Sequence, residues 1–535
     1  MNMKRFVVIG LCLFFILHPE IWSQKNSDSG SRKLQIAFNA ISKLYVDETN
    51  DSIMVEDAIN GILNNLDPHS QYMDAEAAKE RMEPLNGNFD GIGIQYNMLT
   101  DTLYVIQVIP GGPSEKVGLM PGDKIIMVDD SLIAGVKIKT STVMKLLRGP
   151  KGTVVRVKVM RNNKPDLIEF KITRDKIPVY SLDAAYMLDE KTGYIKLNRF
   201  AASSPEEFKN AMGKLKKEGM KQLILDLQGN GGGYLNSAED LADQFLDKNQ
   251  LIVYTQGRKT GRRDYTAGRK GIFEKGKMVV LVDEASASAS EILTGALQDW
   301  DRAVVVGRRT FGKGLVQMPL PMPDGSMITL TVSRYYTPTG RCIQKPYQKG
   351  NAEEYEHDLI DRYNRGELLS ADSIHFPDSL KYSTLVSGRT VYGGGGIMPD
   401  VFIPLDTTRL TDYHRELLAA GCINRVAMNY LDRNREKLTS LYDKKHFSKY
   451  KSEFYVEDDT MDELVELGKN DSIPFNEEEF RRSEQLMRLQ IKALIARDLF
   501  DMSEYYQVIN DINDSLIEAL SIINDEKRYQ SILKN

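Results

Sequence analysis

The stretch VDEASASASEILTGALQD, from Val282 to Asp299, joins two different elements and contains three serines at alternate positions. The run KMVVLVDE that leads into it has the continuous apolar character of a buried strand, and SEILTGALQDW has the apolar spacing of a helix. Ser288 therefore falls on a strand-to-helix turn, where the N–H groups of the first helical turn lack partners. A serine there either caps the helix or is a nucleophile held in open space.

A nucleophilic serine needs a base, and the chain has no histidine between Val179 and His357. A Ser-His-Asp triad would need His69 or a histidine of the C-terminal half. The stretch TFGKGLVQ places Lys313 between two glycines, after the apolar run AVVVG. A lysine serves as a base near neutral pH only if its pKa falls from about 10.4 to roughly 7–8, which takes about 3–5 kcal/mol of burial or cationic neighbours.

The composition excludes several classes of protein. The 535 residues predict two to four domains that each bury a core. The formal net charge is -5 with both signs interspersed, so nucleic acid is not an expected partner. Beyond the N-terminal segment only Cys342 and Cys422 remain, which is too few for a disulfide framework and leaves their pairing open. Their spacing to the six histidines forms no metal site, so we expect no metal.

The first residues, MNMKRFVVIGLCLFFILHPEIWSQ, have the layout of a targeting signal. Lys4 and Arg5 precede an apolar run from Phe6 to Leu17, which is short for a bilayer-spanning helix, and a cleavage site follows Ser23. This pattern predicts a secretory signal peptide over residues 1–23 and therefore an exported protein. A segment retained as an N-terminal membrane anchor is the alternative.

Helical, β-type and mixed patterns follow one another along the rest of the chain. Short β runs broken by glycine and proline surround one helical piece, TSTVMKLLRG, and later strands that are apolar throughout alternate with helices. These patterns predict a multidomain α+β protein in which a β-rich module precedes an α/β core. The expected regions are a helical region at 30–84, the β-rich module at 85–175, the core at 176–405 with a polar, irregular insertion at 346–385, and a helical region at 406–535.

The block VDEASASASEILTGALQDWDRAVVVGRRTFGKGLVQ (282–317) closely resembles the carboxyl-terminal processing proteases, also called tail-specific proteases. The resemblance continues in LDPHSQYM (66–73), DLQGNGGGYL (226–235), YYTPTGRCIQ (335–344) and GGGGIMPDV (393–401). It implies a serine endopeptidase of the periplasm or cell envelope, with a Clp-protease/crotonase-like core and no metal or organic cofactor. It also implies a homodimer built by terminal helices, and an adaptor protein is a further partner to consider.

The resemblance assigns the chemistry residue by residue. By position in the family motifs, Ser288 is the nucleophile, Lys313 is the base and Gln317 is the residue that orients the lysine. Ser286 and Ser290 then become supporting or capping groups.

A glycine-rich stretch, LQGNGGG, follows the apolar run KQLILDL, and glycine lets backbone N–H groups approach a substrate closely. The resemblance assigns the oxyanion hole to the N–H groups of Gly232 and Ala289; a plain glycine-rich turn is the alternative. Relatives often carry Arg where this chain has Gln228 and Pro where it has Gly231, which puts the rigidity of the hole in question.

Two further residues match family positions. Asp299 aligns with a position sometimes linked to activity, although an aspartate near Arg302 is more commonly part of a surface ion pair. His69 in LDPHSQYM matches another motif, and we expect it to have a structural role in the core rather than a catalytic one.

The β-rich module resembles a PDZ domain in NFDGIGIQY and IQVIPGGPSEKVGLMPGDKIIMVDD. Consecutive amides in GIGI would hold the terminal carboxylate of a peptide, which adds as a strand to the adjacent sheet edge. Arg148 fits a family pattern that couples the position of the module to activity. The expected peptide-binding residues are Gly91, Ile92, Gly93 and Ile94 around the carboxylate, with Val143 and Leu147 lining an apolar pocket for the last side chain.

The sequence thus predicts an exported serine endopeptidase that captures the free C-terminal tails of protein substrates through its PDZ module and cleaves them with a Ser-Lys dyad. One alternative is a non-catalytic PDZ scaffold in the cell envelope, which would not need Ser288, Lys313 and Gln317 together. Another is a crotonase-like acyl enzyme, for which a PDZ module has no use.

Overall fold

The computed structural model describes residues 27–99, 101–161, 166–268 and 270–534, and it divides the chain into two units that meet between Asn65 and Leu66. The signal peptide predicted over residues 1–23 lies outside the described residues. The first unit contains the helices α1 (Ser27–Leu44) and α2 (Asp51–Leu63). The side chain of Asn50 caps α2 by accepting hydrogen bonds from the next turn.

The second unit is built around a six-stranded sheet with the order β10-β11-β12-β15-β16-β21. β10 runs antiparallel to β11, and the other neighbours are parallel. The strands are β10 (Leu182–Met187), β11 (Thr192–Leu197), β12 (Gln222–Asp226), β15 (Met278–Val282), β16 (Val304–Gly307) and β21 (Val401–Phe402). The central strands are buried along their whole length, as expected for a parallel sheet covered on both faces.

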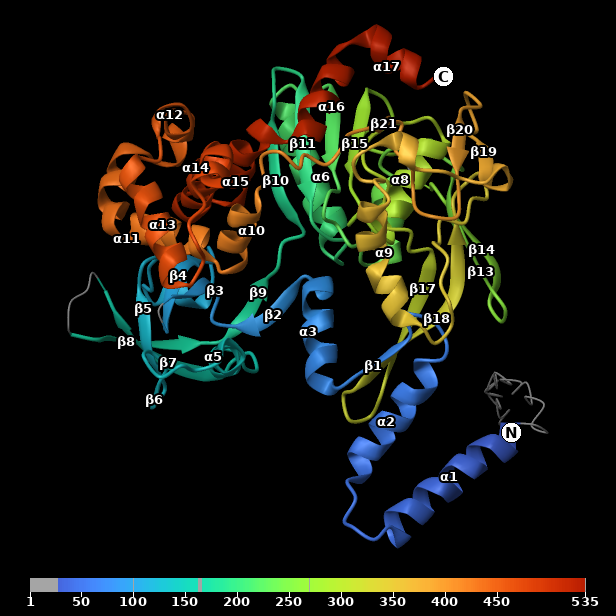
Figure 1. Cartoon of the computed structure of the whole chain (residues 1–535), viewed down its shortest axis with the longest axis horizontal. Coiled ribbons are helices and arrows are strands. Elements are labelled where there is room, and N and C mark those ends of the chain that lie inside the picture. The colour runs from blue at the N-terminus through green and yellow to red at the C-terminus, as the bar shows by residue number, and fades with distance from the viewer. Residues whose placement is uncertain (1–26, 100, 162–165, 269, 535) are drawn as a thin grey trace, which may run out of the picture. The chain divides into compact units, whose positions relative to one another are not determined.

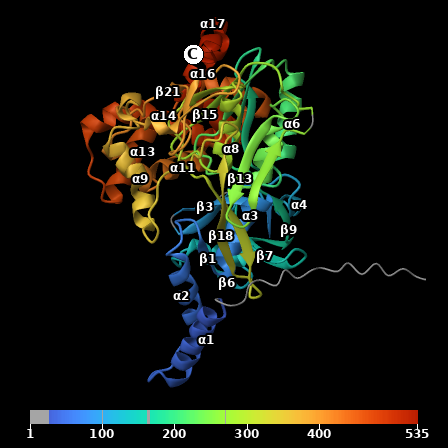
Figure 2. The same cartoon turned by 90° about the vertical axis from the view of Figure 1, so that its right-hand side faces the viewer.

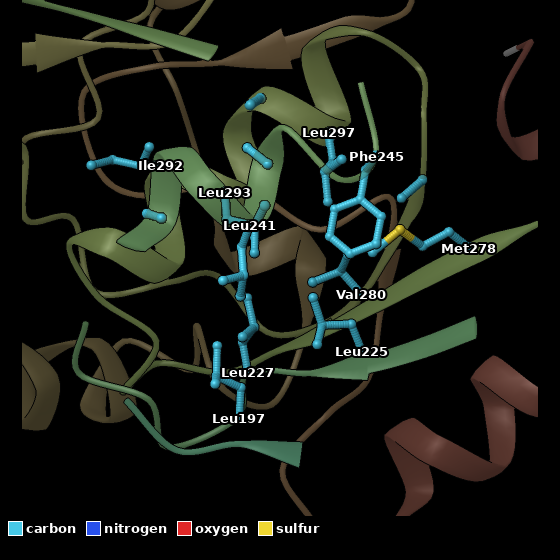
Figure 3. Packing of buried hydrophobic residues seen from close by; sticks show 14 of the residues in the cluster. Leu197, Leu225, Leu227, Leu241, Phe245, Met278, Val280, Ile292, Leu293 and Leu297 are labelled. Atoms are coloured by element: carbon cyan, nitrogen blue, oxygen red, sulfur yellow. The ribbon is translucent and has the colours of Figure 1, made fainter. Parts of the chain in front are cut away.

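Alternate side chains of this sheet enter two different cores. One face packs against α6 (Ser204–Lys217), α7 (Leu235–Ala242) and α8 (Ala289–Asp299). Figure 3 shows Leu225 and Val280 of this face beside the ring of Phe245 and below Leu297 of α8. The other face packs against α16 (Asp514–Asn524) and α17 (Glu526–Ile532), which lie over β15 and its neighbours (Figure 1).

A second sheet carries the segment that follows Lys313. Its long central strand β18 pairs with β17 along one side and with β1 and β13 along the other, and β14 completes the order. These strands are β1 (Gln71–Met73), β13 (Leu251–Gly257), β14 (Gly261–Thr266), β17 (Leu315–Pro321) and β18 (Met327–Tyr336). The pairing of β1 with β18 brings the residues around position 70 next to the partner of β17, the strand that directly follows Lys313.

The β-rich module forms a sheet with the order β3-β4-β5-β7-β8. It is entered through α3 (Ala75–Asn86) and β2 (Asn88–Gly91), and β2 pairs with the exit strand β9 (Asp175–Pro178). The other elements are β3 (Ile94–Leu99), β4 (Thr102–Val108), α4 (Pro113–Lys116), β5 (Lys124–Val128), β6 (Ser131–Leu132), α5 (Thr140–Leu147), β7 (Val154–Met160) and β8 (Ile168–Thr173). Among the described strands only β4 lies beside β3, so β3 is an edge strand.

The segment predicted to be an irregular insertion at 346–385 contains ordered elements. It forms α9 (Ala352–Asn364), two 3-10 turns, η1 (Ala371–Ser373) and η2 (Asp378–Leu380), and β19 (Lys381–Ser383), which pairs with β20 (Thr390–Tyr392). The sequence AEEYEHDLIDRYN obscures α9 because seven of its thirteen residues are charged or histidine. Two of its side chains, Tyr355 and Arg362, are nevertheless buried.

The C-terminal region is helical, as expected, and has a hydrophobic core of its own. Its helices are α10 (Asp412–Ala419), α11 (Cys422–Leu441), α12 (Phe447–Glu453), α13 (Asp458–Asn470), α14 (Glu477–Leu499) and α15 (Met502–Ile509), with the 3-10 turns η3 (Lys444–His446) and η4 (Asn510–Ile512). In Figure 2, α13 and α14 lie on the opposite side of the view from α6. Cys342 and Cys422 are both unpaired thiols. Within the described ranges no helix is long and apolar enough to cross a membrane.

Candidate active site

Ser288 lies on a strained turn at the start of a buried helix. Its φ of 56° is in a region that side-chain-bearing residues rarely adopt. All residues of α8 behind it are buried. Its two serine neighbours secure the turn, because Ser286 Oγ donates to Leu227 O at 2.8 Å and Ser290 Oγ donates to Asn230 O at 2.8 Å. Both bonds tie the serine turn to the glycine-rich loop after β12.

Glu291 connects the turn that carries Ser288 (the serine turn) to the loop of residues 308–314 that carries Lys313 (the lysine loop). The sequence analysis did not identify Glu291. Its carboxylate, which has no exposed surface, accepts from the N–H groups of Ser288 at 2.8 Å, Gly312 at 2.7 Å and Lys313 at 2.9 Å. It also accepts from Thr310 Oγ1 at 2.6 Å. Burial raises the pKa of Glu291, and these donors oppose that rise. The signal for it was the Ser-x-x-Glu spacing of a capping box.

Lys313 lies in the loop between β16 and β17. Burial and, after it, the positive charge of Arg81 lower the pKa of Lys313 to about 8, against the opposing effects of Glu291 and Asp67. This is the direction that a lysine base requires. The hydroxyl of Tyr335 donates to Lys313 O and lies 3.1 Å from Ser288 O, so one side chain contacts the backbone of both residues.

A cavity of about 500 Å³ brings the predicted residues together. Of the predicted site residues, it is lined by Ser288, Lys313, Gln317, Gly232 and Ala289. One wall comes from α3 through Arg81, Met82, Pro84 and Leu85, and apolar side chains such as Leu235, Ile292 and Leu315 line the rest. Among the described residues, no hydrogen bond joins Ser288 Oγ to Lys313 Nζ in this structure.

Gln317 lies in the cavity wall with partners other than the lysine. Its Nε2 donates to Leu315 O at 3.1 Å and to Thr331 Oγ1 at 3.3 Å. Thr331 Oγ1 donates in turn to Asp67 Oδ1 at 2.8 Å. Gln317 is therefore connected to a carboxylate that acts on the pKa of Lys313.

Gly232 approaches Ser288 so closely that a side chain at position 232 would clash. Its φ is 101°, and a Cβ atom there would lie 2.8 Å from Ser288 Cβ and 2.8 Å from Ala287 O. Its N–H donates to Asn230 Oδ1 at 2.8 Å in this structure. Ala289 is the first residue of α8, where backbone N–H groups point out of the helix.

The two departures from the family pattern have different surroundings. The side chain of Gln228 accepts a hydrogen bond from Asn513 Nδ2 at 3.0 Å, so the C-terminal region contacts the glycine-rich loop. A Cβ atom on Gly231 would meet no atom within 4 Å. The chain therefore has space for a larger residue at position 231.

Asp299 lies away from the cavity, and its surroundings differ from those expected. It has no exposed surface and forms a buried ion pair with Arg341, while its second oxygen accepts from Thr339 N at 2.9 Å. The expected surface pair with Arg302 is not formed, because Arg302 donates to the carbonyls of Phe245, Phe273 and Gly276. Asp299 and Arg302 are close in sequence, but their side chains bind different groups.

His69 lies beside the lysine loop and is held neutral. Burial lowers its pKa to about 3, with the charge of Lys313 contributing. Its Nε2 lies 3.1 Å from Tyr355 Oη, and the two rings meet edge to face.

The predicted peptide-binding residues lie between β2 and β3 and on α5. Gly93 has a φ of 76°, and Ile92 O accepts from Ser114 N at 3.0 Å and from Ser114 Oγ at 2.6 Å. Val143 and Leu147 of α5 are buried in the core of this module together with Ile92. The remaining two residues are Gly91, which ends β2, and Ile94, which begins the edge strand β3.

Arg148 connects the module to α3. Its guanidinium forms an ion pair with Glu83 at 2.6 Å and lies over the ring of Phe89 at 4.7 Å from the ring centre. A second pair, Lys145 with Glu76 at 2.8 Å, joins the same two helices. Since α3 also forms one wall of the cavity, the module and the cavity share a structural element.

Comparison with known proteins identifies the class. Residues 191–353 match peptidase family S41, and residues 91–172 match a PDZ domain. Residues 18–77 match the N-terminal domain of the activating protease CtpB, and residues 413–501 match a family of unknown function, DUF8443. The fold and the site are thus those of a serine peptidase with a PDZ domain.

Individual relatives give the family. The carboxy-terminal processing protease CtpA of Bacillus subtilis is 34% identical over 373 residues, which cover 69% of this chain and 78% of that protein. CtpB of the same organism is 36% identical over 323 residues, covering 59% and 66%. The solved photosystem II D1 C-terminal processing protease is 28% identical, covers 59% of this chain and 90% of that one, and has a TM-score of 0.33. The chain belongs to the carboxy-terminal processing proteases, serine endopeptidases with a PDZ domain that recognise the C-termini of their substrates.

Proposed function

We propose that the protein cleaves peptide bonds with a Ser-Lys dyad formed by Ser288 and Lys313. The observation that carries this proposal is the shared carboxylate of Glu291, which binds the backbone N–H groups of both residues at one cavity. A buried lysine with a lowered pKa can remove a proton from the serine, and a strained turn exposes the hydroxyl. A non-catalytic scaffold has no need of this arrangement.

In the proposed reaction, Lys313 Nζ takes the proton of Ser288 Oγ as the oxygen attacks the substrate carbonyl. The C–N bond then breaks, and Lys313 gives its proton to the leaving amine, so that an acyl-enzyme remains. Lys313 next takes a proton from water as the water attacks the ester, and returns it to Ser288 Oγ as the ester C–O bond breaks and the acid leaves. Gln317 orients the lysine in this proposal, through its contact with Thr331 and the Asp67 carboxylate.

The negative oxygen of the intermediate would be stabilised by the N–H groups of Ala289 and Gly232. The position of Ala289 at the start of α8 and the close approach of Gly232 to Ser288 support this assignment. The Gly232 N–H donates to Asn230 in this structure, so substrate must replace that bond. Both N–H groups of the oxyanion hole would therefore point at the substrate only when a substrate carbonyl is bound.

The PDZ module, which we propose spans residues 85–175 before a core at 176–405, would deliver the substrate. A C-terminal segment would add as a strand to β3, with its carboxylate on the amides of residues 91–94. The edge position of β3 supports this mode. Val143 and Leu147 of α5 would favour substrates whose last residue is apolar, because both side chains belong to the apolar core of the module.

The N-terminal unit supports the proposal of a homodimer. Its helices leave many apolar side chains exposed, among them Ile36 at 60%, Leu44 at 82% and Ile53 at 55%. A second copy of α1 and α2 would cover such a surface. Light scattering should give twice the chain mass, and Ile36→Asp with Leu44→Asp should give the single mass; a monomeric wild type would overturn the dimer.

We also propose export to the periplasm or cell envelope through the segment at 1–23. Fractionation of cells and N-terminal sequencing of the exported protein test this proposal, and protein retained in the cytoplasm would contradict it. An adaptor that delivers substrates remains an expectation from the sequence.

The dyad is tested with an unfolded reporter that ends in apolar residues. Wild type should cleave it, Ser288→Ala and Lys313→Ala should lose at least about 10³-fold in kcat/KM, and Lys209→Ala, on the exposed side of α6, should be unaffected. An amidated tail should be cleaved poorly. Equal cleavage by the dyad variants would remove the mechanism, and tight binding without cleavage by wild type would favour a scaffold.

A further inference from the structure

One short region of the chain, residues 344–345, forms hydrogen bonds with the loop that carries Lys313. Lys345 N donates to Gly312 O at 2.9 Å, and Gly314 N donates to Gln344 Oε1 at 2.8 Å. These two bonds fix the residues immediately before and after the lysine. Both partners lie just ahead of α9, the helix in the segment predicted to be irregular.

Arg362 of α9 binds the same loop nearer its beginning, at residues 309 and 310. Only 1% of this residue is exposed, and its guanidinium donates to Thr310 O at 3.1 Å and to Arg309 O at 2.7 Å. Its partner Glu367 lies 3.7 Å away and also binds Arg309. Burying an arginine is unfavourable unless it makes specific hydrogen bonds, and here these bonds go to backbone carbonyls of the lysine loop.

Tyr355 of α9 supplies the next connection. Gln344 Nε2 donates to Tyr355 Oη at 3.3 Å, so the tyrosine proton is free to point at His69 Nε2, 3.1 Å away. Neutral His69 accepts this proton, which places its own N–H on Nδ1. A continuous chain of hydrogen bonds therefore runs from the Gly314 amide through Gln344 and Tyr355 to His69.

The ring of Tyr355 has a separate function. Lys345 Nζ lies 4.0 Å from the centre of the Tyr355 ring and 4.1 Å from that of Phe311, and it forms an ion pair with Asp358 at 2.9 Å. The ring thus packs against Lys345 and meets His69 edge to face, whereas the hydroxyl makes the hydrogen bonds with Gln344 and His69. A change that removes only the hydroxyl separates the two functions.

We propose that α9 is a positioning element for the catalytic lysine, acting through Tyr355 Oη with Gln344 and through Arg362. This inference rests on the proposed dyad. It adds a second support to the one that Glu291 provides from α8. Most of α9 lies beyond the residues that match peptidase family S41, which end at 353.

The experiment compares Tyr355→Phe with Tyr347→Phe, a matched control whose ring lies 6.4 Å from that of Tyr355. Tyr355→Phe should lower kcat about tenfold and leave KM within about twofold, because the lysine is displaced while the substrate-binding cavity keeps its lining. Tyr347→Phe should keep the wild-type kcat. Both should unfold at the wild-type midpoint.

A double-mutant cycle separates positioning from general support of the fold. If Tyr355 acts through Gln344, the losses in kcat of Tyr355→Phe and Gln344→Ala should not add, and the double variant should resemble the worse single one. Arg362→Lys should retain more activity than Arg362→Met, since lysine keeps one donor for the carbonyls.

The outcomes separate this inference from the proposed dyad. A wild-type kcat for Tyr355→Phe, or fully additive losses, with Lys313→Ala inactive, would overturn the role of α9 alone. Retained activity in Lys313→Ala would remove the dyad and with it the reason for a positioning element.

Discussion

Replacing Arg81 should change the pH at which the enzyme works. If neutral Lys313 is the base, kcat/KM is lost as the pH falls below the lysine pKa and levels off above it. With a pKa of about 8, about 10% of the lysine is neutral at pH 7. A lysine at its ordinary value of 10.5 would be neutral in about 0.03% of molecules, so the site gains about 300-fold in available base.

This gain comes mainly from burial, and Arg81 adds to it. Lowering the pKa from 10.5 to about 8 corresponds to about 3 kcal/mol in favour of the neutral amine. The charge of Arg81, on the α3 wall of the cavity, disfavours a second positive charge on Lys313. Removing it should therefore raise the lysine pKa and shift the acidic limb of the profile to higher pH.

The assay is kcat/KM from about pH 6 to pH 10 with a reporter that has no titrating groups in that range. Wild type should rise about tenfold per pH unit and bend near pH 8. Arg81→Gln should bend at higher pH and converge with wild type at the alkaline end. Arg481→Gln on α14, which is outside the cavity lining, is the control. A limb for Arg81→Gln that stays in place or moves to lower pH would refute this electrostatic account.

Three further substitutions test the geometry. Gly232→Ala should reduce kcat at least about 100-fold, because the added Cβ atom would clash with Ser288. The control is Gly229→Ala, where φ is 70° and an added Cβ would meet no atom within 4 Å; it should lose only about 1–2 kcal/mol of stability. Equal kcat values for the two variants would contradict the close approach of Gly232 to Ser288. Glu291→Gln should lower both kcat and the unfolding free energy, the latter by about 2–4 kcal/mol, since an amide cannot accept from all four donors; a wild-type kcat would count against its bridging role. Asp299→Asn should lower the unfolding free energy by about 3–5 kcal/mol by leaving Arg341 without its buried partner. Its kcat per folded molecule should be unchanged, and a selective loss of kcat would show that Asp299 takes part in the reaction.

The local pattern around Ser288 was sufficient to predict its place in the fold. A buried strand followed by a helix leaves a turn between them, and this relation needs only neighbouring residues. The resemblance of the motifs then gave Lys313, Gln317 and Gly232, and the structure has all of them at one cavity. The α/β character of the core was indicated by the same kind of local evidence, the alternation of buried strands with helices.

Residues that reach the site from distant parts of the chain could not be predicted in this way. Arg81 acts on a lysine more than two hundred positions away, and nothing in its own helix indicates this. Asp299 was expected near the surface because Arg302 is close in sequence, yet the fold buries it against Arg341. The charges of α9 concealed a helix whose two buried residues face the lysine loop.

The position of α16 sets an order of events during synthesis. This helix covers the face of the central sheet that includes Ile224, Val279 and Val306. Its side chains Leu516 and Ile522 pack against that face. Ribosomes make the sheet first, so this apolar face stays open to water until α16 has been made. We expect a chain stopped before residue 514 to aggregate and to be inactive. We therefore expect the growing chain to be unable to cleave neighbouring proteins until its own synthesis has passed residue 514.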